Sequence, residues 1–306
     1  MSKSIKDNKY YFKVSQDNPE EHLDEFYIFD QKHPDIKEYA KNTRRIKNIL
    51  ITIKILIGKK EKVDVVDKYY QELQKLLSGF SNCSEFSCFV NACDNTLNAV
   101  KDDLQLLKNI TKRYFAKRVL NELAPEEWIQ AILDSNSSRK KGKCGEIKLA
   151  AILKKTGFKK ADSWEEFKNI KRGFAEFSKV FSIEEARVVL GIKIKTRKQG
   201  KNLDLIIKSD KRVFLVEAKH LNTSGGEQDK QISELIEILS LSEENKNISY
   251  VSFLDGSYSN ILLAENIKKA GKKLKSQCRE IEKYLRKNEN NFWVNTAGFE
   301  ALIIDL

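Results

Sequence analysis

The sequence predicts an α/β protein with a mainly helical N-terminal region. In the second half of the chain, two short apolar runs flank a turn and are followed by a helix-like pattern, as in a hairpin and its crossover. From residue 35 to about 120, apolar residues instead recur every three or four positions, which is the period of a buried helix face. We therefore expect a helical region over residues 1–135 and an α/β core over residues 136–306.

The charge balance favours a polyanionic partner. The chain has 306 residues, a formal net charge of +12 and a pI near 9.2, which suits nucleic acid, although a lysine-rich composition alone would give the same numbers. No secretory signal opens the sequence, and the most apolar window, residues 49–57, contains Lys54 and is too short to span a membrane. The odd count of five cysteines favours reduced thiols. We expect a cytoplasmic protein with no membrane partner.

The N-terminal pattern becomes helical from residue 35, with a first helix up to residue 57, a second over residues 63–77 and a third helical region over about 86–120. The first has one apolar stripe and a stop at Gly58. Its stripe consists of Ile46, Ile49, Leu50, Ile53 and Ile57. This region could clamp DNA, mediate dimerisation or serve as a scaffold that covers the sheet of the core, and the sequence leaves all three open.

The connector between the two regions is polar and basic. It follows a short helix expected over residues 125–133, and it is either an exposed linker or a loop that contacts phosphate. Its candidate DNA-binding residues are Arg139, Lys140 and Lys143. In the next expected helix, residues 145–156, Glu146 shares a face with Leu149 and Leu153. Because glutamate is seldom buried without a partner, Glu146 is a candidate site residue, although the helix macrodipole also favours an acid there.

The following segment leads to a second basic loop. Residues 164–181 are expected to be irregular, with aromatic side chains that pack, and Ser182 with Glu185 resembles a capping box. A short strand is expected at residues 192–194. The loop after it is well placed to track a phosphate backbone, and its candidates are Arg197, Lys198 and Lys201.

The central hairpin combines two apolar strands, residues 203–207 and 213–218, with turn residues between them. Because strand side chains alternate faces, Glu217 and Lys219 point the same way, and across a hairpin Asp204 could join them near one end of the sheet. Carboxylates bind hard divalent cations, and a lysine can orient a water or neutralise phosphate charge. The grouping favours metal-assisted phosphodiester hydrolysis. The alternative is a surface hairpin with an ordinary Glu/Lys pair.

The loop after the hairpin is rich in small and hydrogen-bonding residues. Its DNA-binding candidates are Asn222, Thr223 and Ser224, followed by Gln228 and Gln231 at the edge of the next helix, where helix-start polarity would explain them almost as well. Strand alternation turns His220 away from Glu217, so we interpret it as structural or DNA-contacting. Beyond this helix we expect a core strand at 248–254, a lysine-rich helical stretch at 261–287, and strands at 292–295 and 301–306.

Asp204, followed after a turn by Glu217-Ala218-Lys219, resembles the PD-(D/E)xK nuclease superfamily, which includes many type II restriction endonucleases. Leu203 stands where the family has proline. The resemblance covers roughly the second half of the chain and implies a restriction-endonuclease-like core, in which helices flank a mixed central sheet. It implies that Asp204 and Glu217 bind Mg²⁺ and that the Ala218 carbonyl contributes. Lys219 would position or activate the attacking water, and Glu146 would complete or support the metal site.

The resemblance also implies a reaction and partners. A type II site-specific deoxyribonuclease would cleave double-stranded DNA at a defined sequence, with Mg²⁺, and leave 5′-phosphate and 3′-hydroxyl ends. Such enzymes usually act as homodimers on palindromic sites, and the host normally carries a cognate DNA methyltransferase. Two alternatives stay open: a repair or junction-resolving nuclease of the same superfamily, and a non-catalytic basic DNA-binding scaffold.

Overall fold

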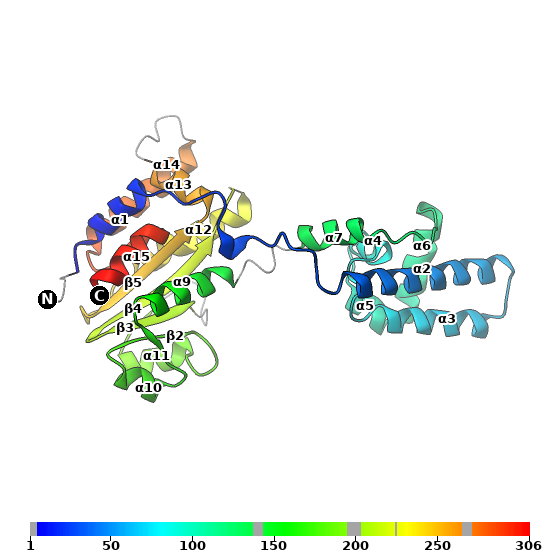
Figure 1. Cartoon of the computed structure of the whole chain (residues 1–306), viewed down its shortest axis with the longest axis horizontal. Helices are drawn as coiled ribbons and strands as arrows, with labels where there is room; N and C mark the ends of the chain where they lie inside the picture. Colours follow the sequence, from blue (N-terminus) through cyan, green and yellow to red (C-terminus); the bar gives the residue numbers. More distant parts are fainter. Residues whose placement is uncertain (1–4, 137–142, 195–202, 224, 265–270) are drawn as a thin grey trace. The chain divides into compact units, whose positions relative to one another are not determined.

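The chain forms two compact units, a helical unit of residues 29–139 and a core unit that combines residues 1–28 with residues 140–306 (Figure 1). The computed structural model describes residues 5–136, 143–194, 203–223, 225–264 and 271–306. The boundary expected at residue 135 lies close to the observed one. The first 28 residues, however, belong to the core unit and not to the helical one. Within the described ranges, no helix is long and apolar enough to cross a membrane.

The core unit is built on a mixed sheet, and its six described strands follow one another in chain order. The middle strands are antiparallel, whereas the pairs β1–β2, β4–β5 and β5–β6 are parallel. The strands are β1 (Lys159–Lys160), β2 (Arg172–Glu176), β3 (Leu205–Ser209), β4 (Arg212–His220), β5 (Ile248–Asp255) and β6 (Phe292–Val294). Asp210 adopts a positive φ of 51° in the turn between β3 and β4, a conformation that aspartate tolerates better than most residues. This turn sets the register of the hairpin.

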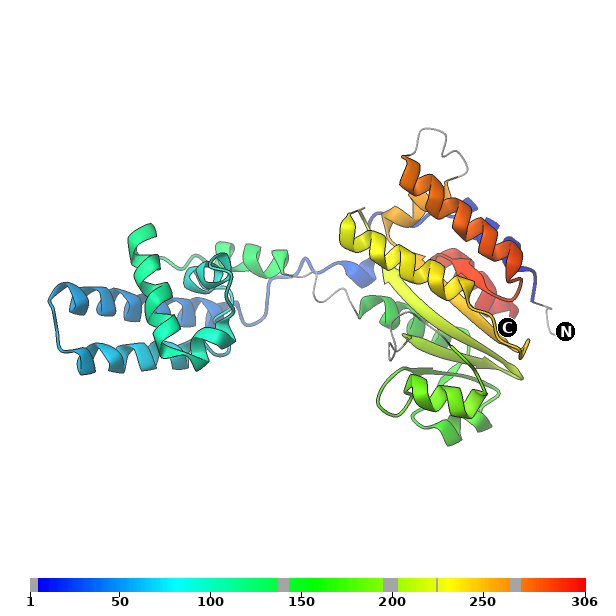
Figure 2. The same cartoon turned by 180° about the vertical axis from the view of Figure 1, so that it is seen from behind.

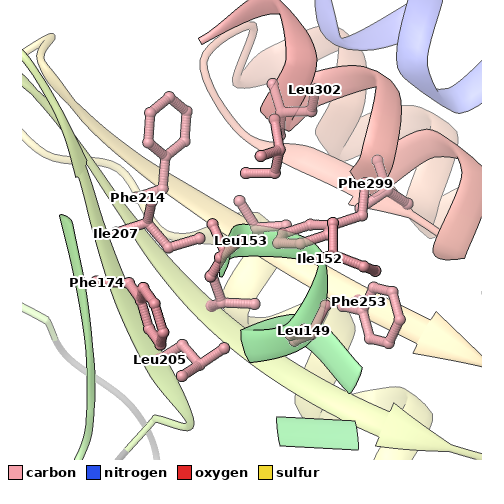
Figure 3. Packing of buried hydrophobic residues seen from close by; sticks show 14 of the residues in the cluster. Leu149, Ile152, Leu153, Phe174, Leu205, Ile207, Phe214, Phe253, Phe299 and Leu302 are labelled. Atoms are coloured by element: carbon pink, nitrogen blue, oxygen red, sulfur yellow. The ribbon is translucent and has the colours of Figure 1, made fainter. Parts of the chain in front are cut away.

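Helices cover both faces of the sheet. One face packs on α9 (Cys144–Lys155), α15 (Thr296–Asp305) and α1 (Asn8–Asp17), with buried residues such as Leu153, Phe214 and Phe299 between them (Figures 1 and 3). The other face packs on α12 (Gly226–Ser240), α13 (Ser257–Leu263) and α14 (Lys272–Lys287), which Figure 2 shows from behind. The small helices α10 (Trp164–Asn169) and α11 (Ile183–Leu190) continue this second layer. The sheet is therefore the middle layer of three.

Helix α1 docks on the C-terminal part of the core unit. Tyr11 is fully buried in the hydrophobic cluster that also contains Phe299 of α15. The side-chain amide of Asn8 donates hydrogen bonds to the carbonyl oxygens of Leu285, Asn288 and Asn291. At the other end of the helix, the amide of Asn295 donates to Ser15 and Asn18. These polar contacts join segments far apart in sequence, which is why the local pattern of residues 1–34 did not predict a helix here.

The helical unit has its own hydrophobic cluster. Its described helices are α2 (Ile36–Gly58), α3 (Val63–Leu76), α4 (Glu85–Ala92), α5 (Leu97–Asp102), α6 (Leu104–Lys117) and α7 (Glu126–Ser135). The region expected to be helical over about residues 86–120 is helical, and it is divided into α4, α5 and α6. The side chains of Ser84, Thr96 and Asp103 each cap the start of a new helix, because their oxygens accept backbone N–H groups that helix starts leave unsatisfied.

Several other expectations need correction. Residues 164–181 are not irregular but contain α10 and β2, and residues 192–194 form no strand. Residues 301–306 are not a strand either, since they complete α15, whose start is capped by Asn295. Near residue 26 the chain forms a 3-10 helix, η1 (Glu25–Tyr27). The expected cap is confirmed, because the Ser182 side chain accepts from the Glu185 N–H at 3.2 Å.

Candidate active site

Asp204 and Glu217 lie close together at one end of the β3–β4 hairpin. The strand register ends with Leu205 opposite Val216, and Asp204, directly before β3, donates its N–H to the Val216 carbonyl at 3.0 Å. The charge of Glu217 acts on the Asp204 carboxyl group. The Asp204 carboxylate accepts the N–H of Ala218 through Oδ2 at 2.7 Å. The antiparallel register therefore brings together the two acidic residues that the sequence separates by a strand and a turn.

Lys219 completes this grouping. Its ammonium group donates to Oε1 of Glu217, and strand alternation puts both side chains on the same face of β4. The Glu217 side chain is only 1 % exposed, whereas the Lys219 side chain is 18 % exposed. The expected convergence of Asp204, Glu217 and Lys219 is thus present. The carboxylate lies at the bottom of the site and the ammonium group lies nearer to solvent.

Glu146 approaches the hairpin from α9. The first turn of this helix lies against β4, because a Cβ placed on Gly145 would meet the Ala218 methyl group at 3.8 Å. Glu146 is half-buried, and its pKa is raised, first by burial, then by the negative charge of Glu176 and more weakly by that of Glu217, while Lys143 and Lys219 oppose the change. Glu146 therefore lies within electrostatic reach of the hairpin residues.

The site concentrates negative charge. Burial raises the pKa of Asp204 to about 7, and the charges of Glu217 and, more weakly, Glu146 add to this effect. Lys219 and the N–H of Ala218 act in the opposite direction, since both favour the carboxylate form. The net effect on Asp204 is a raised pKa, so an additional cation beside these carboxylates would be favourable.

The donor set suits a hard divalent cation such as Mg²⁺. Carboxylate oxygens of Asp204, Glu217 and Glu146, together with the Ala218 carbonyl, are the kind of ligands that this ion prefers. Across the described ranges, no group of three or more His, Cys, Asp or Glu side chains is already arranged to hold a metal ion. One reason is visible in the contacts, because Lys219 occupies Oε1 of Glu217. The residues therefore fit the ion in chemistry, without a preformed cage.

The predicted DNA-binding residues divide into two groups. Arg139, Lys140, Arg197, Lys198, Lys201 and Ser224 lie outside the described residues. Of the others, Lys143 is exposed at the start of α9, and Gln228 and Gln231 are half-buried on α12. Thr223 is exposed in the loop after β4. Asn222 is also exposed, but it has structural contacts, since its Oδ1 accepts from the Ser257 N–H at 3.0 Å.

A second polar cluster, which the sequence reasoning missed, lies at the same end of the sheet. Asp255 is fully buried at the end of β5 and accepts from Tyr27, Lys148 and His220. The sequence did carry a signal for it, because Asp255 ends an apolar run, as Glu217 with Lys219 does. The predicted structural role of His220 agrees with its contacts, which are with Asp255, Asn222 and the Tyr27 ring.

Comparisons with family models, curated proteins and solved structures give no match for this chain. The interpretation of the site therefore depends on its own geometry and chemistry.

Proposed function

We propose that the core unit is a Mg²⁺-dependent endonuclease that cleaves double-stranded DNA in the manner of a type II restriction enzyme. The observation that carries the proposal is the grouping of Asp204, Glu217 and Lys219. Asp204 accepts the N–H of Ala218, the residue after Glu217, and Lys219 donates a hydrogen bond to Glu217. Burial and the charge of Glu217 raise the pKa of Asp204 in this site. The order of elements supports it further. A helix with an acidic first turn precedes three antiparallel strands, and a helix and a parallel strand follow.

The residues of the site suit phosphodiester hydrolysis. Asp204, Glu217, Glu146 and the Ala218 carbonyl would hold Mg²⁺, which supplies positive charge to polarise a phosphoryl oxygen. Lys219 orients the attacking water and neutralises charge that develops on the phosphate. The water oxygen bonds to phosphorus, the bond from phosphorus to the 3′ oxygen breaks, and the protons of the water divide between the new 5′-phosphate and the 3′-hydroxyl.

The partners belong to the same proposal. A net charge of +12 gives the chain electrostatic attraction to DNA phosphates, and Lys143, Thr223, Gln228 and Gln231 are the described residues best placed by sequence to contact DNA. A homodimer would match a palindromic site, and a cognate methyltransferase would protect host DNA. The helical unit would contribute to DNA clamping or dimerisation.

Substitution of the hairpin residues tests the reaction directly. Lys219→Ala and Asp204→Ala should each lower the rate of plasmid cleavage in Mg²⁺ at least about 100-fold, because each removes a group that acts on the reacting phosphate or its metal. Lys193→Ala is the matched control, since Lys193 forms an exposed ion pair with Glu244 in the same unit and should leave the rate unchanged. Cleavage by Lys219→Ala or Asp204→Ala protein at the wild-type rate would refute the assignment.

A further inference from the structure

Asp255 joins three elements of the core unit through one fully buried carboxylate. Its Oδ2 accepts from the Tyr27 hydroxyl at 2.8 Å and from the Lys148 ammonium group at 3.2 Å. Its Oδ1 is 2.9 Å from Nδ1 of His220. These donors come from η1, α9 and β4, and Asp255 itself ends β5. A single side chain therefore fixes four segments at the end of the sheet where Asp204 and Lys219 lie.

The three donors are themselves held by other contacts. Lys148 is also ion-paired with Asp24 at 2.6 Å and Glu20 at 3.6 Å, and its side chain is only 5 % exposed. The Tyr27 ring stacks on the His220 imidazole with 3.5 Å between centroids. Removal of charged groups from water is costly unless the geometry satisfies them well, so such a network favours one arrangement of its elements over near alternatives.

The orientation of His220 also follows from these contacts. The Asn222 Oδ1 accepts from the Ser257 N–H, so the Asn222 amide nitrogen faces Nε2 of His220 at 3.2 Å. Nε2 therefore accepts a hydrogen bond, and Nδ1 carries the hydrogen that it donates to Asp255. Both ring nitrogens are engaged within the protein, so the ring holds position and is not directed at a substrate.

The elements joined by Asp255 carry the proposed metal site. Lys148 lies two residues from Glu146 on α9, and His220 directly follows Lys219 on β4. β4 and β5 are paired in parallel, with His220 opposite Asp255. The hydrogen bonds to Asp255 therefore restrict how α9 can shift against β4, which is the motion that would separate Glu146 from Glu217 and Lys219.

We propose that Asp255 is a positioning residue of the candidate active site, which holds Glu146 in register with Glu217 and Lys219 by joining Lys148 to His220. This inference depends on the proposed nuclease function and adds a residue that touches neither the metal nor the DNA. It separates two roles, since Asp255 should influence metal binding and turnover but not DNA affinity.

The test compares Asp255→Asn with a matched substitution at the other end of the sheet. Asp305 is also buried, and its carboxylate accepts a hydrogen bond from the Tyr11 hydroxyl at 3.0 Å. Its neighbour Leu306 accepts a hydrogen bond from the side chain of Ser209, the last residue of β3. Both Asp255→Asn and Asp305→Asn should lower the melting temperature. Only Asp255→Asn should weaken Mn²⁺ binding, measured by calorimetry on the full chain without DNA, by about 10- to 100-fold.

Cleavage and DNA binding complete the test. Asp255→Asn should lower the cleavage rate at saturating DNA by a similar factor and leave the Kd for DNA within about twofold of the wild-type value. If Asp255→Asn protein does not fold, Tyr27→Phe removes one of the three donors and should change Mn²⁺ affinity in the same direction by about fivefold. Equal Mn²⁺ affinities of Asp255→Asn and Asp305→Asn, or of Tyr27→Phe and wild type, would overturn the role of Asp255 and leave the proposed nuclease function standing. A wild-type chain that neither binds Mn²⁺ nor cleaves DNA overturns the proposed function as well.

Discussion

At the scale of single residues, Asp204 shows a large electrostatic effect of the site, because its pKa is raised to about 7. It is half-buried and lies within reach of the Glu217 charge, and among the described residues Lys219 and the Ala218 N–H favour its charged form. The sequence predicted that Asp204, Glu217 and Lys219 would converge, because alternation and hairpin register are local rules. It did not predict Asp255, Lys148 and Tyr27, since their contacts join segments more than a hundred residues apart.

The raised pKa of Asp204 predicts how stability depends on pH in the absence of metal. The folded protein holds this proton up to about pH 7, whereas the ordinary pKa of the group is 3.8, so the stabilising contribution is complete below pH 4 and is lost as pH rises through 7. In urea unfolding with EDTA, the free energy of unfolding should fall by about 2 kcal/mol more between pH 5 and pH 8 for wild type than for Asp204→Asn. The same pH dependence in both proteins would show that Asp204 does not titrate in this range.

At the scale of helices and strands, the sequence succeeded where one element buries an apolar stripe or run. The hairpin, α9, α12 and β5 were all predicted for this reason. Residues 301–306, the end of α15, were predicted as a strand. Leu302 and Ile303 are both buried, and a short helix buried on several sides has a continuous apolar run in its sequence, as a buried strand does. α1 was missed because its buried residues are Asn8, Tyr11 and Ser15, which do not form an apolar stripe.

The contact between α1 and α15 depends on a glycine. A Cβ on Gly298 would lie 2.0 Å from the Ser15 hydroxyl and 2.8 Å from the Tyr11 carbonyl oxygen. Gly298→Ala should therefore force the two helices apart and cost about 2 kcal/mol, which lowers the melting temperature by roughly 5 °C. Gly271→Ala is the control, since a Cβ there meets no atom within 4 Å, and it should change the melting temperature little. Equal melting temperatures for the two variants would contradict this packing.

At the scale of the whole molecule, the chain consists of two units with separate hydrophobic clusters. The sequence predicted a helical region and an α/β core, and it placed their second boundary within a few residues. It did not predict that residues 1–28 return to the core unit, because membership of a unit depends on contacts between distant segments and not on local periodicity.

Because the two units have separate hydrophobic clusters, we expect a core substitution in one unit to destabilise that unit and not the other. Leu50 is fully buried in the helical unit, and Leu50→Ala should destabilise that unit by about 2–5 kcal/mol. Hydrogen exchange should then accelerate in α2, α3 and α6 and stay unchanged in β3, β4 and β5. Leu215→Ala, which removes a fully buried residue of the sheet, should give the opposite pattern. Faster exchange throughout the chain in both variants would mean that the two units unfold as one.

We propose that the hairpin residues Asp204, Glu217 and Lys219 form the active site of a sequence-specific DNA endonuclease. Incubation of purified wild-type and Glu217→Gln proteins with long unmethylated duplex DNA and Mg²⁺ tests this claim. We expect discrete fragments with 5′-phosphate ends from the wild type and intact DNA from the variant. A smear from the wild type alone would keep the nuclease and remove the sequence specificity, and cleavage confined to branched DNA would indicate a repair or junction-resolving enzyme. DNA binding by both proteins without cleavage of any of these substrates would contradict the claim and favour a DNA-binding scaffold.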